Sequence, residues 1–159
     1  MATRDPFDAD VQAFLRRFGW HEDYFHDSTG WVDWLTQEGF AVTPLAVEIM
    51  ERLGGVSISP NGNNEVFFSI FEAPDLIPDF MTELAGLLET PVTPVADWQA
   101  MQSLLAGGDG AVYACYATYV FKVGNDLNSA LRKVLLDDGE ITRIWRREKV
   151  GAPWVKPPD

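Results

Sequence analysis

The chain has 159 residues, 47% of them hydrophobic and 13% aromatic, and its formal net charge at pH 7 is −12. This length suits one domain with its own core, and this composition excludes disorder for most of the chain. The strong negative charge disfavours nucleic acid and anionic membranes as partners, and no apolar run approaches the roughly eighteen residues that a membrane-spanning helix needs.

Helical periodicity predicts three helices in the first third of the chain, over residues 7–18, 29–38 and 44–53. Asp5 and Pro6 are typical of the start of the first helix, because Asp caps a helix and Pro suits its first turn. Thr43 precedes Pro44 in the same way, which gives the third helix the clearest start.

After Gly54 and Gly55 the pattern changes from helical spacing to alternation. We predict two hairpins, two further helices and one short strand from this pattern. The predicted elements are strands 56–59 and 65–71, a helix over 78–88, strands 100–105 and 111–118 joined by a glycine-rich turn at 107–110, a strand over 119–123 and a helix capped at Asn125 that ends near Leu136. Together they predict one α+β domain with an antiparallel sheet flanked by helices.

The predicted domain covers residues 1–140, and residues 141–159 form a basic, Pro-containing C-terminal tail. The tail carries Arg143, Arg146, Arg147, Lys149 and Lys156. We expect its PWVKPP ending to lack fixed structure, as chain ends do unless something holds them.

Charge is unevenly distributed along the chain. Between Arg17 and Lys122 there are fifteen acidic residues and a single base, Arg52, so this stretch alone has a net charge of −14. Two interpretations stay open: the acids keep the protein soluble, or they accelerate the approach of a basic partner.

One acidic row is the first candidate for a partner-binding face. Asp75, Asp79 and Glu83 are four residues apart, with Glu72 beside them, so a helix would align them. Acids also favour a helix N-terminus, which gives the row a structural alternative. A further alternative is that Arg143, Arg146 and Arg147 fold back and neutralise the row.

Aromatic residues supply the other candidates. Trp98 lies in a predicted link before a strand, and we expect it to be exposed and to join the partner-binding residues. A second acidic cluster, Glu22, Asp23 and Asp27, precedes Trp31 and Trp34. The helical spacing of these two tryptophans favours core positions for both.

Catalytic signatures are weak. His21 and His26 are five residues apart, which does not align them on a helix, and with Cys115 as the only cysteine a tetrahedral zinc site is not expected. Cys115 lies in an apolar alternating run, so we expect a buried thiol in a reducing compartment. No lysine of a phosphate-binding loop follows the glycines at 107–110. We therefore predict no enzyme activity, no cofactor and no metal.

Several short motifs follow one another in a recognisable order: Phe18-Gly19-Trp20, Trp31-x-x-Trp34-Leu35 before Gly39-Phe40, the helix ending in Gly54-Gly55-Val56, Val92-Thr93-Pro94-Val95, the turn and strand 109–113, and a leucine-rich closing helix over 125–136. In this order the chain resembles the SUKH superfamily of bacterial immunity proteins, specifically its third subgroup. The resemblance covers roughly residues 7–138.

The resemblance implies a cytoplasmic antidote that binds and neutralises a cognate toxin of a polymorphic or contact-dependent system. Many such toxins are nucleases or deaminases with basic substrate grooves, which an acidic protein complements. We expect a monomer or weak homodimer, and the polar, acidic start of the chain is unlike a secretory signal. The alternative function is a small-molecule-binding or hydrolytic protein that uses buried carboxylates.

Overall fold

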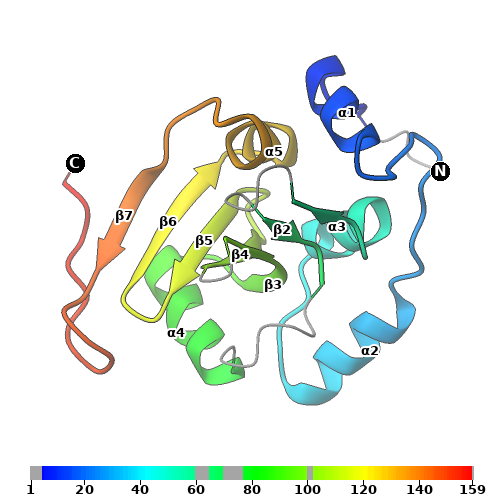
Figure 1. The fold of residues 1–159 in the computed structure, drawn as a ribbon. Helices are drawn as coiled ribbons and strands as arrows, with labels where there is room; N and C mark the ends of the chain where they lie inside the picture. Colours follow the sequence, from blue (N-terminus) through cyan, green and yellow to red (C-terminus); the bar gives the residue numbers. More distant parts are fainter. Residues whose placement is uncertain (1–4, 60–64, 70–76, 100–101, 159) are drawn as a thin grey trace.

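The computed structural model describes residues 5–59, 65–69, 77–99 and 102–158. Within these ranges five helices and a seven-stranded antiparallel sheet form one α+β domain, which confirms the predicted fold class (Figure 1). The helices are α1 (Ala9–Arg16), α2 (Thr29–Glu38), α3 (Pro44–Leu53), α4 (Pro78–Leu88) and α5 (Leu127–Leu136). The strands are β1 (Ser57–Ile58), β2 (Val66–Phe67), β3 (Val92–Trp98), β4 (Gln102–Gly107), β5 (Val112–Tyr116), β6 (Tyr119–Gly124) and β7 (Thr142–Arg146).

The sheet is a meander in which each strand pairs antiparallel with the next strand along the chain. Both predicted hairpins are present, as β1–β2 and β4–β5. The predicted loop at 60–64 and the predicted strand residues 70–71 and 100–101 lie outside the described residues. In the β4–β5 turn the Gly107 N–H donates to the Ala111 carbonyl at 2.8 Å. Gly110 has a φ of +89°, a conformation that glycine adopts without strain.

β3 is a strand that the sequence analysis does not predict, for two physical reasons. Its interior contains Pro94, and proline is normally confined to edge strands or bulges. A register shift between Pro94 and Ala96 accommodates the proline. In addition, five consecutive residues from Val92 are buried, so the strand shows no alternation of polar and apolar positions.

The helices follow the predicted pattern closely, with shifts at two starts. α4 has the predicted bounds, and Thr43 caps α3 by accepting the Ala46 N–H at 3.2 Å. α5 is capped by Asp126 rather than Asn125, because the Asp126 carboxylate accepts the Ser129 N–H and the Ser129 hydroxyl accepts the Asp126 N–H. α1 begins at Ala9, later than the Asp5–Pro6 signal indicates.

The core lies between the sheet and the helices. α3 packs against β3 and β4, α4 against β3, and α5 against both β6 and α1. Leu105 and Val120 in the middle of the sheet are fully buried. Cys115 is buried as predicted, and burial raises the pKa of its thiol to about 12.

Part of the C-terminal tail is held against the rest of the molecule, so the expectation that PWVKPP lacks fixed structure is wrong for Trp154 and Val155. β7 pairs with β6 beyond the boundary predicted at residue 140, and Arg146 and Val155 exchange two backbone hydrogen bonds of 3.2 and 2.6 Å. The tail therefore runs along the edge of the sheet (Figure 1). None of the helices in the described ranges combines the length and apolar character needed to cross a lipid bilayer.

Candidate partner-binding surface

The structure describes two members of the predicted acidic row, and they have different surroundings. Glu72 and Asp75 lie outside the described residues. Asp79 is exposed in the first turn of α4, and no hydrogen bond or ion pair of its side chain exists within the described part of the chain. Glu83, one turn later, is bound from two directions by the C-terminal tail.

Glu83, Arg147 and Trp154 form a cluster that we call the tail clamp. One Glu83 carboxylate oxygen accepts the Arg147 Nη1–H and the Trp154 Nε1–H, each at 2.8 Å. The Arg147 Nε–H donates to the Ala117 carbonyl at 2.8 Å, and its guanidinium lies 4.4 Å from the centre of the Trp154 ring. The Arg147 side chain is only 3% exposed, against 42% for Glu83. Of the fold-back contacts considered from the sequence, the one between Arg147 and Glu83 is present.

Trp98 is buried, so the prediction that it is exposed is wrong. It is the last residue of β3 and pairs with Val66 on one side and Gln102 on the other. Its side chain is 7% exposed and meets Phe121 edge-on, with 6.4 Å between ring centres. The physical reason is the missed strand: a residue assigned to a link is instead inside the sheet.

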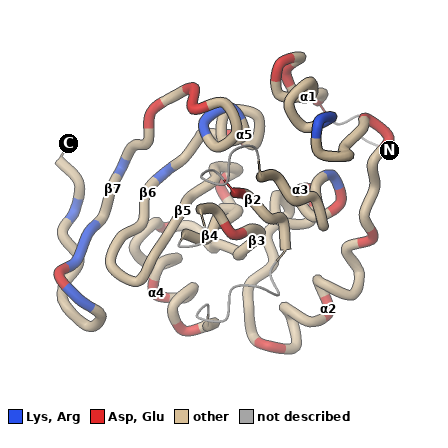
Figure 2. The backbone as a smooth tube through the Cα atoms, in the orientation of Figure 1, with Lys and Arg blue, Asp and Glu red and all other residues tan. Residues whose placement is uncertain are grey.

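A larger acidic surface extends from the segment before α2 onto the start of α4. We define it as Asp23, Asp27, Asp33, Glu38 and Asp79, all of them exposed. Between Phe18 and Glu51 the chain has six acidic residues and no Lys or Arg, and Figure 2 shows no basic residue along α2. A Cβ built at Gly39 would lie 3.8 Å from the Pro78 side chain, so the end of α2 meets the start of α4.

Exposed apolar side chains lie within this acidic surface. Phe25 is 67% exposed between Asp23 and Asp27, and Trp34 is 37% exposed on α2. Trp31 is buried as predicted, whereas Trp34 is not a fully buried core residue. The Thr29 N–H donates to Asp27 at 3.0 Å, and this hydrogen bond lowers the pKa of the Asp27 carboxyl below its usual value.

Other acidic residues are neutralised within the fold. Arg132 on α5 binds Asp8, Asp10 and Asp138, and we call this group the α1–α5 junction. The Arg132–Asp10 contact is 2.7 Å, and its hydrogen bond lowers the pKa of the Asp10 carboxyl. Glu22 pairs with Arg16 at 2.7 Å, so this member of the predicted second cluster is compensated too.

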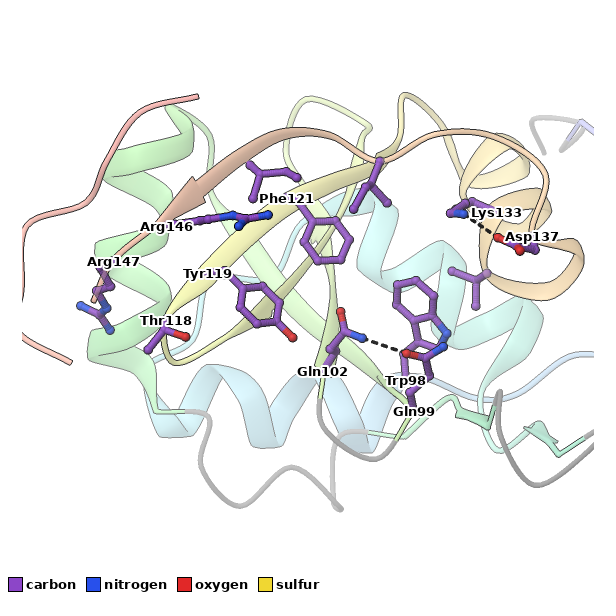
Figure 3. Close-up of a pocket in the computed structure, with 13 residues that line it drawn as sticks. Trp98, Gln99, Gln102, Thr118, Tyr119, Phe121, Lys133, Asp137, Arg146 and Arg147 are labelled. Carbon is purple, nitrogen blue, oxygen red and sulfur yellow. Dashed lines mark hydrogen bonds and ion pairs between the residues drawn. The ribbon is translucent and has the colours of Figure 1, made fainter. Parts of the chain in front are cut away.

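A hollow of about 670 Å³ lies on the sheet face that is turned away from α4 (Figure 3). β3, β4, β6, β7 and α5 all contribute to its lining. Its described lining residues include Lys133, Arg146 and Arg147 but no His, Cys or Ser. The hollow therefore offers cations and aromatic surface rather than the nucleophile–base pair of a hydrolase.

Comparison with known proteins gives one match. A family model described as SUKH-3 immunity protein matches residues 7–137, which is most of the chain. The comparison with curated proteins found no match, and neither did the comparison with solved structures.

Proposed function

The chain belongs to the SUKH-3 immunity protein family, and from this membership we propose that it neutralises a basic cognate toxin, a nuclease or deaminase, in the cytoplasm. Immunity through a cognate toxin partner is the function of the family. The observation that carries the finer proposal is the acidic surface, which has no basic residue among the 32 positions between Phe18 and Glu51. Complementary charge accelerates encounter and sets orientation.

Internal ion pairs decide which acids remain for a partner. Glu83, Asp8, Asp10 and Asp138 are bound within the fold, whereas the described part of the chain provides no side-chain partner for Asp33, Glu38 or Asp79. We infer that these last three acids contact the toxin, together with Glu72 and Asp75, which shortly precede Asp79 in the sequence. Glu83 then serves as a positioning residue that holds the tail.

Apolar anchors support the same surface. Interfaces draw most of their binding free energy from a few aromatic side chains surrounded by polar contacts. Phe25 and Trp34 are exposed within the acidic surface and fit this description. The acidic residues would guide the approach of the toxin, and the aromatic side chains would supply short-range contacts. A surface of this kind would block a basic substrate groove of the toxin.

The alternative of a hydrolytic protein requires buried carboxylates with raised pKa values. Within the described ranges no Asp or Glu side chain is buried; the buried charged residue there is Arg147. No observation favours this alternative, and the absence of enzyme activity stays a prediction.

The test is charge neutralisation with a matched control. One variant carries Asp33→Asn, Glu38→Gln and Asp79→Asn; the control carries Glu89→Gln, Glu140→Gln and Glu148→Gln, three exposed acids elsewhere with the same change in charge. With the cognate toxin domain, we expect the association rate to fall about tenfold at low salt for the first variant and about twofold for the control. Equal slowing in both variants would show that net charge acts without a defined face.

A further inference from the structure

The hollow on the sheet face has a floor of connected aromatic rings. Trp98, Phe121 and Tyr119 follow one another across β3 and β6 (Figure 3), with 6.4 and 5.9 Å between successive ring centres. Tyr116 continues the row, 5.9 Å from Tyr119. Side chains of a strand alternate between faces, so these residues share a face with Arg146, which is opposite Tyr119 in the β6–β7 register.

The charges around this floor are opposite in sign to the rest of the protein. Its described lining residues include three cations and one acid, Asp137, in a chain of net charge −12. Lys133 pairs with Asp137 at 2.6 Å and Arg147 pairs with Glu83, which leaves Arg146. The Arg146 side chain is exposed and makes no hydrogen bond or ion pair with any residue that the structure describes.

A buried donor at the end of the floor also lacks an acceptor. Trp98 is 7% exposed, and its indole N–H finds no hydrogen-bond partner among the described residues. Buried N–H groups in folded proteins nearly always have an acceptor. Gln102 lies beside Trp98 in the register, but its amide donates to Gln99 at 3.1 Å. This end of the hollow would therefore favour an incoming oxygen atom.

We propose that the hollow binds an extended segment of the cognate toxin that carries a carboxylate next to an apolar side chain. The carboxylate pairs with Arg146, the apolar side chain lies on Tyr119 and Phe121, and a backbone carbonyl of the segment reaches the end of the floor near Trp98. Charge complementarity selects this occupant, because the exposed Arg146 guanidinium attracts a carboxylate and repels a basic segment, and the overall charge of the protein repels nucleic acid.

The inference rests on the proposed function and extends it to two-site recognition. The acidic surface attracts the basic toxin from a distance. The hollow then binds one acidic segment of the toxin. Such a requirement would discriminate among toxins of equal charge, because a partner without the carboxylate leaves Arg146 unpaired in the interface.

The test compares two arginines of the same strand. Arg146→Glu reverses the charge in the hollow, and Arg143→Glu makes the same change at an exposed residue outside the hollow lining. With a catalytically inactive form of the toxin, we expect Arg146→Glu to raise Kd at least about thirtyfold, mainly through faster dissociation. For Arg143→Glu we expect a rise in Kd of less than about threefold, because this exposed residue lies outside the hollow lining and its charge acts chiefly on the association rate. Equal affinities of the two variants would overturn the proposal.

Two further measurements separate the possible failures. Thermal melting of the variants excludes a folding defect. The affinity of Arg146→Gln then shows the effect of losing the positive charge alone, because Gln adds no new charge. The indole N–H resonance of Trp98, assigned with Trp98→Phe, should shift when toxin is added. The same shift with acetate alone would mean a simple anion site and overturn the segment proposal. If the wild-type protein neither binds nor protects against the toxin, the proposed function itself fails.

Discussion

The tail clamp and the α1–α5 junction both join distant parts of the chain through an arginine and carboxylates, but they differ in burial. Arg147 in the clamp is 3% exposed and has a carboxylate, a carbonyl and an aromatic ring around it. Arg132 in the junction is 27% exposed and binds three carboxylates that are themselves half exposed. Ion pairs in water contribute little, whereas a buried cation that loses its partners is expensive. The difference in burial predicts that the tail clamp contributes more to the free energy of unfolding than the α1–α5 junction does.

The largest effect is expected from removing the cation of the clamp. Arg147→Ala deletes the contacts to Glu83 and Ala117 and the packing on Trp154, so we expect the free energy of unfolding to fall by about 3 kcal/mol. For a chain of this size that corresponds to a decrease in Tm of roughly 6–12 °C. The control is Arg143→Ala, which should change the free energy by less than about 0.5 kcal/mol. Calorimetry that finds the two variants equal would show that the tail adds no stability.

Removing the carboxylate of the tail clamp should lower the free energy of unfolding by a smaller amount. The control is Asp79, a neighbouring acid on the same helix. Glu83→Ala leaves the Arg147 charge buried, and we expect a loss of about 2 kcal/mol, less than for Arg147→Ala because Glu83 is 42% exposed. Asp79→Ala removes only a favourable charge in the first turn, for about 0.5 kcal/mol. Urea unfolding of both variants measures the difference.

The same pair should respond in the opposite order to the toxin. Asp79 belongs to the acidic surface, so Asp79→Ala should slow association more than Glu83→Ala does, provided that binding is measured at a temperature where both variants are folded. If Glu83→Ala slows association more strongly than Asp79→Ala while both variants are folded, Glu83 itself contacts the toxin. The predicted acidic row is then the binding face.

Local patterns were sufficient for much of the fold. The bounds of α4, the cap of α3 and the β4–β5 hairpin follow from spacing, capping and turn residues that lie within a few positions of one another. β3 escaped prediction because Pro94 and continuous burial conceal a central strand. β7 escaped because its arginines resemble a solvated tail, while its pairing with β6 is a property of the folded sheet.

The candidate site was less predictable, since its contacts join distant positions. Glu83 and Arg147 are 64 residues apart, and no local signal distinguishes Glu83 from Asp79. The acidic excess of the first two thirds was evident in the sequence, but the aromatic floor and Arg146 come from different strands and meet only in the sheet. The wrong expectation for Trp98 has the same origin, because its exposure depended on a strand that was not recognised.

The smallest effect is expected from the α1–α5 junction, and it should depend on pH. Arg132 lowers the pKa of Asp10, so the folded state binds fewer protons than the unfolded chain in the acidic range. The stabilisation is therefore complete above the ordinary Asp pKa of 3.8 and is lost as the pH falls through the lowered value.

The Tm of Arg132→Ala should therefore lie slightly below that of the wild-type protein near neutral pH and approach it as the pH falls below the ordinary Asp pKa of 3.8. Added salt should narrow the gap as well, because the group is exposed and its charges are screened. The gap for Arg147→Ala should persist at about pH 4, since much of it comes from the carbonyl contact and from packing, which do not titrate. A gap for Arg132→Ala that stays constant with pH would mean that α1 is held by apolar packing on α5 and that the junction contributes no charge-dependent stability.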